Sequence, residues 1–115
     1  MSRRSLKRGV VSRQAPAPVF AALGDRTRLL LVAKLSGGQQ RSISQLAKGS
    51  RLTRQAITKH LRVLESARIV RCVRAGRESL FEFNPEPIDE LRQYLDLVSA
   101  RWDEALIRLK SFVET

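Results

Sequence analysis

The sequence contains little of what disulfides, metal sites and membrane anchors require. Its 115 residues include one cysteine, Cys72, and one histidine, His60. One Cys cannot form an internal disulfide, and one Cys with one His cannot build a metal site within a protomer. No apolar run approaches the length of a membrane span, and no apolar segment follows the basic start of the chain as in a signal peptide. We therefore predict a cytoplasmic protein without a metal, a cofactor or a membrane partner.

Residues that could support catalysis are equally scarce. His60 stands in a predicted helix, and the sequence places no nucleophile or carboxylate pair beside it. Nothing in the sequence therefore indicates an enzyme. The length of the chain suits one domain with one core and is too short for two.

Acidic residues are rare in the first two thirds of the chain. Residues 1–40 contain eight Lys and Arg against one acid, and residues 41–77 contain ten against one. Residues 78–115 reverse the balance, with four basic and nine acidic residues. A surface built only for solubility would mix both signs, whereas this segregation is typical of a protein that binds a polyanion. Nucleic acid is favoured over an acidic membrane, because the basic segments supply no amphipathic helix with exposed bulky apolar residues.

Composition divides the chain into a tail and one domain. Residues 1–14 combine basic residues with Ser, Gly and Gln, which predicts a disordered tail that either adds phosphate contacts or has no role. In the domain, residues 15–115, we expect a first helix over 18–23 and a second helix through Leu35 that is capped by Asp25. The second helix is apolar almost all round, so we expect it to be the central core helix. Its apolar residues are Leu29, Leu30, Val32, Ala33 and Leu35.

Residues 44–66 have the spacing of a helix-turn-helix, with a short helix capped by Ser44, a tight turn, and a longer helix capped by Thr53. At about 100° per residue, the apolar residues gather on one side of the longer helix: Ile57, Leu61 and Leu64. Its opposite side is polar and basic, with Gln55, Thr58, Lys59 and Arg62. Such a helix fits the major groove of DNA, where Gln and Lys read base edges and Thr and Arg hold phosphates. A solvated polar face is the alternative.

Two runs of β-forming residues, 69–74 and 79–83, flank a turn at Gly76 and predict a β-hairpin. A hairpin directly after a helix-turn-helix is a wing. Arg74 and Arg77 at its tip could reach the adjacent minor groove or its phosphates, although hairpin tips are commonly charged for solubility alone.

The last helix is predicted over residues 85–114. Its apolar residues recur at alternating spacings of three and four: Ile88, Leu91, Leu95, Val98, Trp102, Ala105, Leu109 and Phe112. A rod of about 40 Å is too long to be covered by a small winged domain, so we expect part of this seam to meet a second copy. The residues that we place in this dimer contact are Leu91, Leu95, Val98, Trp102 and Leu109. A two-fold dimer would present two recognition helices to an inverted repeat with half-sites about one helical turn apart.

These segments together resemble the ArsR/SmtB family of bacterial winged-helix repressors. The resemblance spans about residues 17–84 and rests on the motifs at 22–28, 44–47, 52–64, 69–70 and 76–77. The last helix, with Arg101-Trp102 and Arg108-Leu109, is similar to the SdpR-like branch of that family. The resemblance implies a mainly α (α+β) winged helix-turn-helix with a two-stranded wing and a long C-terminal dimerisation helix. It also implies a homodimer held by the last helix and by the first, which contains Val19 and Phe20.

The resemblance further implies a protein that represses its own or a neighbouring operon and releases DNA when a signal arrives. By position, the family's base-contacting stretch matches Arg54, Gln55, Thr58 and Lys59, and its wing contact matches Arg77. His60 matches a histidine common in the family, and we expect it to be packed and hydrogen-bonded rather than to read bases. The full predicted DNA-binding set is Arg54, Gln55, Thr58, Lys59, Arg62, Arg74 and Arg77.

The chain departs from the metal sensors of that family. These use a Cys-x-Cys pair near the start of the first helix of the helix-turn-helix, or His and acidic ligands on the last helix. Here residues 43–47 read Ile-Ser-Gln-Leu-Ala, and the last helix has no His or Cys. Carboxylates alone, such as Asp96 and Asp103, make a poor zinc or arsenic site. Metal sensing is therefore not expected, and the sequence does not identify the effector.

The single cysteine lies in the first strand of the predicted hairpin, where we expect plain packing. Two other roles stay open: a disulfide between Cys72 and its twin in a dimer, and redox control of a thiol beside Arg71 and Arg74. Redox control requires an exposed thiol, which the sequence alone does not establish.

These observations predict a homodimeric repressor that binds a specific sequence in double-stranded DNA. A winged-helix protein–protein adaptor is an alternative that would require an exposed apolar patch. An RNA-binding protein is another, because positive charge alone does not distinguish nucleic acids, although such proteins usually expose aromatic residues for stacking. Packing in the hairpin or last helix accounts for five of the six aromatic residues: Phe81, Phe83, Tyr94, Trp102 and Phe112.

Overall fold

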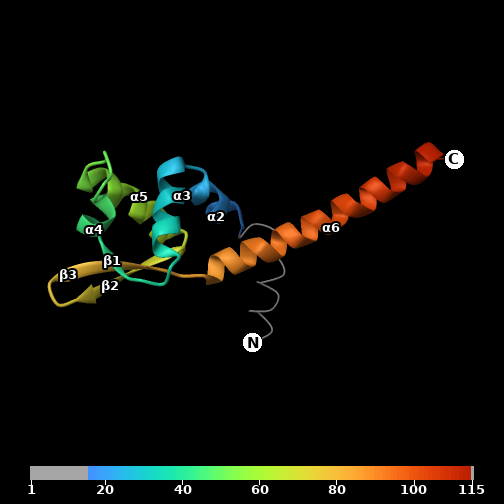
Figure 1. Cartoon of the computed structure of the whole chain (residues 1–115). Coiled ribbons are helices and arrows are strands. Elements are labelled where there is room, and N and C mark those ends of the chain that lie inside the picture. Colours follow the sequence, from blue (N-terminus) through green and yellow to red (C-terminus); the bar gives the residue numbers. More distant parts are fainter. Residues whose placement is uncertain (1–15, 115) are drawn as a thin grey trace, which may run out of the picture.

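The computed structural model describes residues 16–114. Its elements, in chain order, are α2 (Pro16–Leu23), α3 (Arg26–Leu35), β1 (Arg41–Ser42), α4 (Ile43–Ala47), α5 (Arg54–Ser66), β2 (Val70–Ala75), β3 (Glu78–Phe83) and α6 (Glu86–Glu114). Helices α2 to α5 and the sheet form one body, from which α6 projects (Figure 1). The tail predicted over residues 1–14 lies outside the described residues. The mainly α winged fold is confirmed.

The core lies between α2, α3, α5 and the sheet, and α3 contributes Leu31 and Leu35 to it. The prediction that α3 is buried nearly all round is wrong, because Leu29 and Leu30 are 52% and 58% exposed. Helix α3 contacts α2, α5 and β3 on its inner side, and its outer side stays open to solvent in the described part of the chain. Asp25 occupies the N-cap position as predicted, but its side chain accepts no capping hydrogen bond.

Helix α4 begins at Ile43, two residues earlier than a cap at Ser44 would allow, and the predicted cap is wrong. Ser42 is the N-cap: its side chain accepts a hydrogen bond from the Gln45 amide at 3.2 Å. The Gln45 side chain in turn accepts one from the Ser42 amide at 2.8 Å. This reciprocal pair is a capping box, which satisfies two amides that the helix itself leaves unpaired. Ser42 serves at the same time as the end of β1.

The predicted hairpin is confirmed, and it is part of a sheet with a third strand, β1. Strand β3 pairs antiparallel with β2 on one side and with the two-residue β1 on the other. Ala75 and Glu78 face each other across a two-residue turn, in which Gly76 has a φ of 65°. A glycine with positive φ at the first position of such a turn matches the strand twist of a hairpin. The turn therefore holds Arg77 at the tip of the wing.

Helix α5 ends in a Schellman motif that the sequence does not reveal. The amide of Ile69 donates to the Leu64 carbonyl at 3.0 Å, and the amide of Arg68 donates to the Glu65 carbonyl at 2.9 Å. Arg68 adopts a left-handed φ of 65°, a conformation that usually favours glycine. The Asn84 side chain donates to the Arg68 carbonyl at 2.8 Å. This bond ties the end of α5 to the start of α6.

Helix α6 packs on α2 only through its first turns. Leu91 is 8% exposed, and the ring of Tyr94 meets that of Phe20 edge-on, with centroids 6.2 Å apart. Farther along, α6 leaves the body and its large apolar side chains are exposed (Figure 1). No helix within residues 16–114 is long and apolar enough to cross a membrane.

Two of the residues predicted for dimerisation are buried within the protomer. Val19 and Leu91 belong to the core of the protomer, with 5% and 8% of their surface exposed. Helix α2 packs on α3, α5 and α6, so these side chains are already covered by their own chain. The other predicted dimer residues keep accessible surface: Phe20, Leu95, Trp102 and Leu109 are exposed and Val98 is half-buried.

Candidate nucleic-acid interface

The two sides of α5 differ as the sequence predicts. Ile57, Leu61 and Leu64 are buried, which fixes the back of the helix against the core. On the outer side, Arg54, Gln55, Lys59 and Arg62 are exposed. Burying three large apolar side chains at about 1.5–3 kcal/mol each is ample to anchor a 13-residue helix. The polar residues are therefore presented to solvent by a rigid element.

Thr58 is the exception on the outer side. Its hydroxyl donates to the Arg54 carbonyl at 2.7 Å, and the residue is half-buried. That bond turns the hydroxyl hydrogen back toward the helix backbone, so the hydroxyl can act outward only as an acceptor. At the start of the helix, Thr53 caps α5 as predicted, because its hydroxyl oxygen accepts a hydrogen bond from the Ala56 amide at 3.1 Å.

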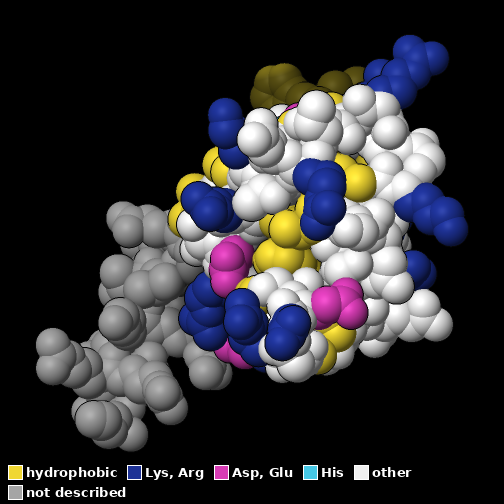
Figure 2. Space-filling view, turned by 90° about the vertical axis from the view of Figure 1, so that its left-hand side faces the viewer, with side chains coloured by type: hydrophobic (Ala, Val, Ile, Leu, Met, Phe, Trp, Pro, Cys, Tyr) yellow, Lys and Arg dark blue, Asp and Glu magenta, His cyan; other side chains and the backbone are white. Residues whose placement is uncertain are grey.

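The wing adds basic residues near the end of the body that lies away from α6 (Figure 1). Arg77 is exposed in the hairpin turn, and Arg74 is exposed in β2, where its guanidinium donates to the Ser79 hydroxyl at 3.5 Å. Figure 2, which faces this end of the molecule, shows more Lys and Arg side chains than Asp and Glu. Exposed Lys48 and Arg51 in the turn between α4 and α5 belong to the same helix-turn-helix. Sequence reasoning missed them, although their place in that turn was a signal.

Arg71, by contrast, is bound by Glu82 on the exposed surface of the sheet. The guanidinium Nε donates to Glu82 Oε2 at 2.7 Å, and the Gln40 side chain donates to Glu82 Oε1 at 2.7 Å. The hydrogen bond from Gln40 and then that from Arg71 hold the pKa of the Glu82 carboxyl below its ordinary value of 4.5. The carboxylate thus links β3 to β2 and to the residue before β1. The Arg71 guanidinium is already paired with this carboxylate and is therefore less available to a DNA phosphate.

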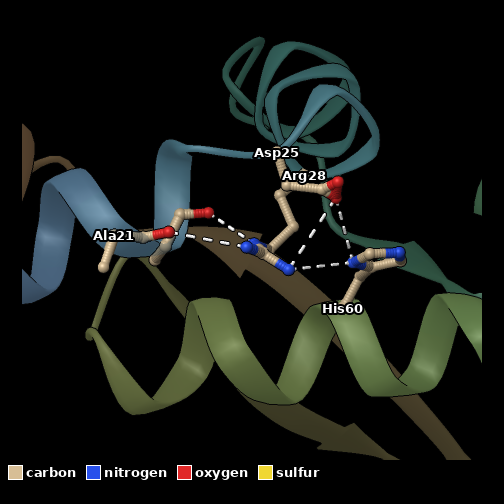
Figure 3. A network of polar contacts seen from close by, with 5 residues as sticks. Ala21, Asp25, Arg28 and His60 are labelled. Carbon is tan, nitrogen blue, oxygen red and sulfur yellow. Dashed lines mark hydrogen bonds and ion pairs between the residues drawn. The ribbon is translucent and has the colours of Figure 1, made fainter.

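His60 takes part in a network behind the recognition helix (Figure 3). Its Nδ1 lies 3.2 Å from Nη1 of Arg28 and 3.5 Å from Oδ2 of Asp25. The same Arg28 guanidinium donates through Nε to the Ala22 carbonyl and through Nη2 to the Ala21 carbonyl at 3.4 Å. The expected packed, hydrogen-bonded histidine is therefore what the structure contains.

Cys72 does not pack in the core. Its side chain is exposed, although alternation along β2 places it on the same face of the strand as the buried Val70. The expectation of plain packing is wrong at this position. Within residues 16–114, no group of three or more His, Cys, Asp and Glu is arranged to hold a metal ion.

A helix packed by its apolar side, with a basic outer side and an arginine-tipped hairpin beside it, defines a winged helix-turn-helix of the DNA-binding class. Residues 23–73 match a family model described as a helix-turn-helix domain. The chain is 39% identical over 79 residues to an uncharacterized HTH-type transcriptional regulator, YuzN, of Bacillus subtilis, which covers 64% of this chain and 86% of that protein.

Solved structures lead to the same family. An ArsR-like transcriptional regulator from Rhodococcus sp. RHA1 is 34% identical with a TM-score of 0.76, covering 87% of this chain and 93% of that one. The homodimeric winged helix-turn-helix DNA-binding domain of a possible ArsR-family regulator from Mycobacterium bovis is 25% identical with a TM-score of 0.62, covering 86% and 88%. The chain belongs to the ArsR family of HTH-type transcriptional regulators, and it is a DNA-binding regulator.

Proposed function

We propose that the protein is a homodimeric repressor that binds an inverted repeat in double-stranded DNA. The observation that carries this proposal is the sidedness of α5: its apolar side is buried, while Gln55 and Lys59 are exposed on an element that fits the major groove. Gln55, Thr58 and Lys59 would discriminate bases. Arg54, Arg62, Arg74 and Arg77 would hold phosphates and supply affinity that does not depend on sequence.

Exposed apolar surface on α6 supports the dimer. Leu95, Trp102 and Leu109 are 47%, 65% and 58% exposed, and they continue the seam that Leu91 begins in the core. A monomer rarely leaves so long an apolar stripe in water. The structural relative from Mycobacterium bovis is itself described as homodimeric. The second copy would pair its α6 with this one and set the distance between the two recognition helices.

The signal that releases DNA is proposed not to be a metal bound by thiolate or imidazole ligands. Helix α6 contains no Cys or His, and α4 contains neither. Zinc and arsenic favour those ligands over carboxylates. DNA binding measured with and without equimolar Zn²⁺ checks this point, and release of the DNA at that ratio would contradict it.

Selection from random double-stranded DNA tests the main proposal. We expect recovered fragments to contain an inverted repeat whose half-sites lie about one helical turn apart. On that fragment, a dimer that contacts about 8–10 phosphates gives a slope of log K against log salt of about −7 to −9. Recovery of no common sequence, or binding only to single-stranded RNA, would overturn the proposal.

A further inference from the structure

We infer that Asp25, Arg28 and His60 are positioning residues that fix the rotation of the recognition helix and thereby set DNA specificity. This inference rests on the proposed function, because specificity has meaning only for a protein that prefers one DNA sequence. None of the three side chains belongs to the predicted DNA-contacting set. They act through α5, which carries that set.

The network joins three elements through one guanidinium (Figure 3). Arg28 in α3 donates to the carbonyls of Ala21 and Ala22, which end α2, and its Nη1 reaches His60 in α5 at 3.2 Å. The Arg28 side chain is only 18% exposed, and those of Asp25 and His60 are 28% and 23% exposed. The bonds from Arg28 to Ala22 and to His60 are therefore partly shielded from water, and such bonds are stronger than those on an open surface.

Apolar packing alone does not fix the angle of α5 about its own axis as closely. Ile57, Leu61 and Leu64 hold the helix against the core through contacts that have no preferred direction. The bond from Arg28 to His60 is directional, and His60 follows Lys59 in the helix. A small rotation that breaks this bond displaces Lys59 along the groove, whereas phosphate attraction changes little. Loss of the network should therefore reduce discrimination between sequences more than overall affinity.

The chemistry of the imidazole defines a second arrangement of the same atoms. A guanidinium only donates, so Nδ1 of His60 accepts from Arg28 only where this nitrogen carries no proton. A proton on Nδ1 removes that acceptor. Asp25 Oδ2 then lies 3.5 Å from Nδ1. This oxygen is buried and has no hydrogen-bond partner within residues 16–114, although it forms an ion pair with Arg28 Nη1 at 3.8 Å. Protonation would therefore exchange the partner of His60 from Arg28 to Asp25.

Charged groups near this ring come from α5 itself and from the elements packed on it. Helix α5 carries Arg54, Lys59, Arg62 and Glu65. Helices α2 and α4, which both pack on α5, contain no charged residue. Strand β2 also packs on α5 and carries Arg71, paired with Glu82, and Arg74, beside Ser79. Helix α3 carries Arg26 and Lys34 besides Arg28. Asp25 and Arg28 are the charged groups in contact with His60 in the described part of the chain.

Three variants test the inference on the full chain. His60→Leu removes the acceptor, His60→Asn places an amide oxygen near Nδ1 and does not titrate, and Ser66→Ala is a matched control at the exposed end of α5. Fluorescence anisotropy measures Kd for the selected inverted repeat and for a scrambled duplex at constant ionic strength. The readout is the specificity ratio, the Kd for the scrambled duplex divided by the Kd for the inverted repeat, measured from pH 8 to pH 5.5. A thermal melt of each protein shows whether it is folded.

We expect His60→Leu to lower this ratio about tenfold at pH 8, the loss expected for one hydrogen bond to a charged group. The wild type should lose a similar factor between pH 8 and pH 5.5, because a proton on Nδ1 removes the same acceptor. His60→Asn should keep the high ratio at both pH values. If His60→Leu does not fold, Arg28→Gln breaks the same bond from the other side and should lower the ratio likewise.

An unchanged ratio in both His60→Leu and Arg28→Gln would overturn the inference. If affinity falls equally on both duplexes, the ratio is also unchanged, and the network has a purely structural role. A wild-type ratio that falls with pH in parallel with that of His60→Asn would also contradict it. If the wild type itself shows no preferred duplex at any pH, the proposed function fails first. The two failures are thus distinguishable.

Discussion

The basic residues of the surface differ in whether they already bind a partner within the fold. Arg71 is bound by Glu82 and Arg28 by two carbonyls and His60, so both are committed within the fold. Lys59 and Arg77 project into solvent. Net charge therefore overstates the number of side chains that can move to a phosphate, and position in the fold decides which residues serve DNA.

Alanine at Gln55 or Lys59 should affect specificity, whereas alanine at Arg77 should not. We expect Gln55→Ala or Lys59→Ala to cost about 1–3 kcal/mol on the selected inverted repeat and to relax the preference at one base per half-site. Arg77→Ala should weaken binding to all duplexes more evenly. Titration of selected and scrambled duplexes checks this division, and equal losses on both for the two classes of variant would contradict it.

Replacement of Arg68 by glycine should stabilise the fold. The left-handed φ of 65° costs a side-chain-bearing residue about 1–2 kcal/mol, while glycine loses about 0.5–1 kcal/mol in chain entropy. The net gain is about 0.5 kcal/mol, seen as a higher urea midpoint at unchanged slope and equal protein concentration. The control Arg62→Gly lies inside α5 and should destabilise by about 1 kcal/mol. A lower midpoint for Arg68→Gly would contradict this account.

The sequence predicted the sidedness of α5 because helical periodicity depends only on spacing, and Ile57, Leu61 and Leu64 keep it without interruption. It did not predict the left-handed turn at Arg68, where the Arg68 carbonyl accepts a hydrogen bond from the Asn84 side chain, 16 residues away. The partner of Arg28 was equally invisible, because His60 lies 32 residues farther along the chain. Long-range polar pairs have no local signature.

Among the elements, the wing depends on side-chain links as well as on its backbone ladder. Glu82 on β3 binds Arg71 on β2 and Gln40 before β1, so one carboxylate holds three segments together. Strand β1 itself is two residues long, too short to show alternation in the sequence. It forms through its pairing with β3, which requires the folded hairpin, and it ends at Ser42, the N-cap of α4.

The link through Glu82 predicts a pH dependence of stability. Because its folded-state pKa lies below the ordinary 4.5, the unfolded chain binds more protons at low pH, and the stabilisation is complete above about 4.5 and lost as the pH falls through the folded pKa. Thermal melts of the wild type and Glu82→Gln should therefore differ at pH 7 and converge near pH 3. A difference that grows toward acid would contradict this assignment.

Element boundaries were predicted well where a cap or a breaker marks them, as at Thr53 and Gly76. They were missed where two residues could serve the same role, as with Ser42 and Ser44. The outward side of α3 was misjudged because its composition is apolar, and composition alone does not reveal whether another element covers Leu29 and Leu30. That depends on how the helices pack.

At the scale of the whole molecule, α6 separates two tasks. Its first turns complete the core through Leu91, while the remaining length extends from the body with Trp102 65% exposed. At 1.5 Å per residue, its 29 residues span about 43 Å. The sequence predicted this length from its apolar repeat, but not the point at which the seam leaves the core, since that depends on how far α2 reaches.

A charge in the exposed seam should separate the dimer. We expect Trp102→Glu to shift the protein toward monomer in sedimentation velocity and to lower affinity for the inverted repeat, with little change for a single half-site. Gln93→Glu adds the same charge at an exposed position outside the seam and should leave both measurements unchanged. A Trp102→Glu protein that stays dimeric would exclude this face from the interface.

The exposed apolar residues of α6 make the amount of regulator depend on gene dosage. If two chains meet through α6, then below the dissociation constant of that pairing the amount of assembled regulator grows with the square of the number of copies in the cell. A twofold fall in synthesis would then leave about a quarter of the assembled form. Promoter output would respond steeply to dilution at cell growth, without any small molecule.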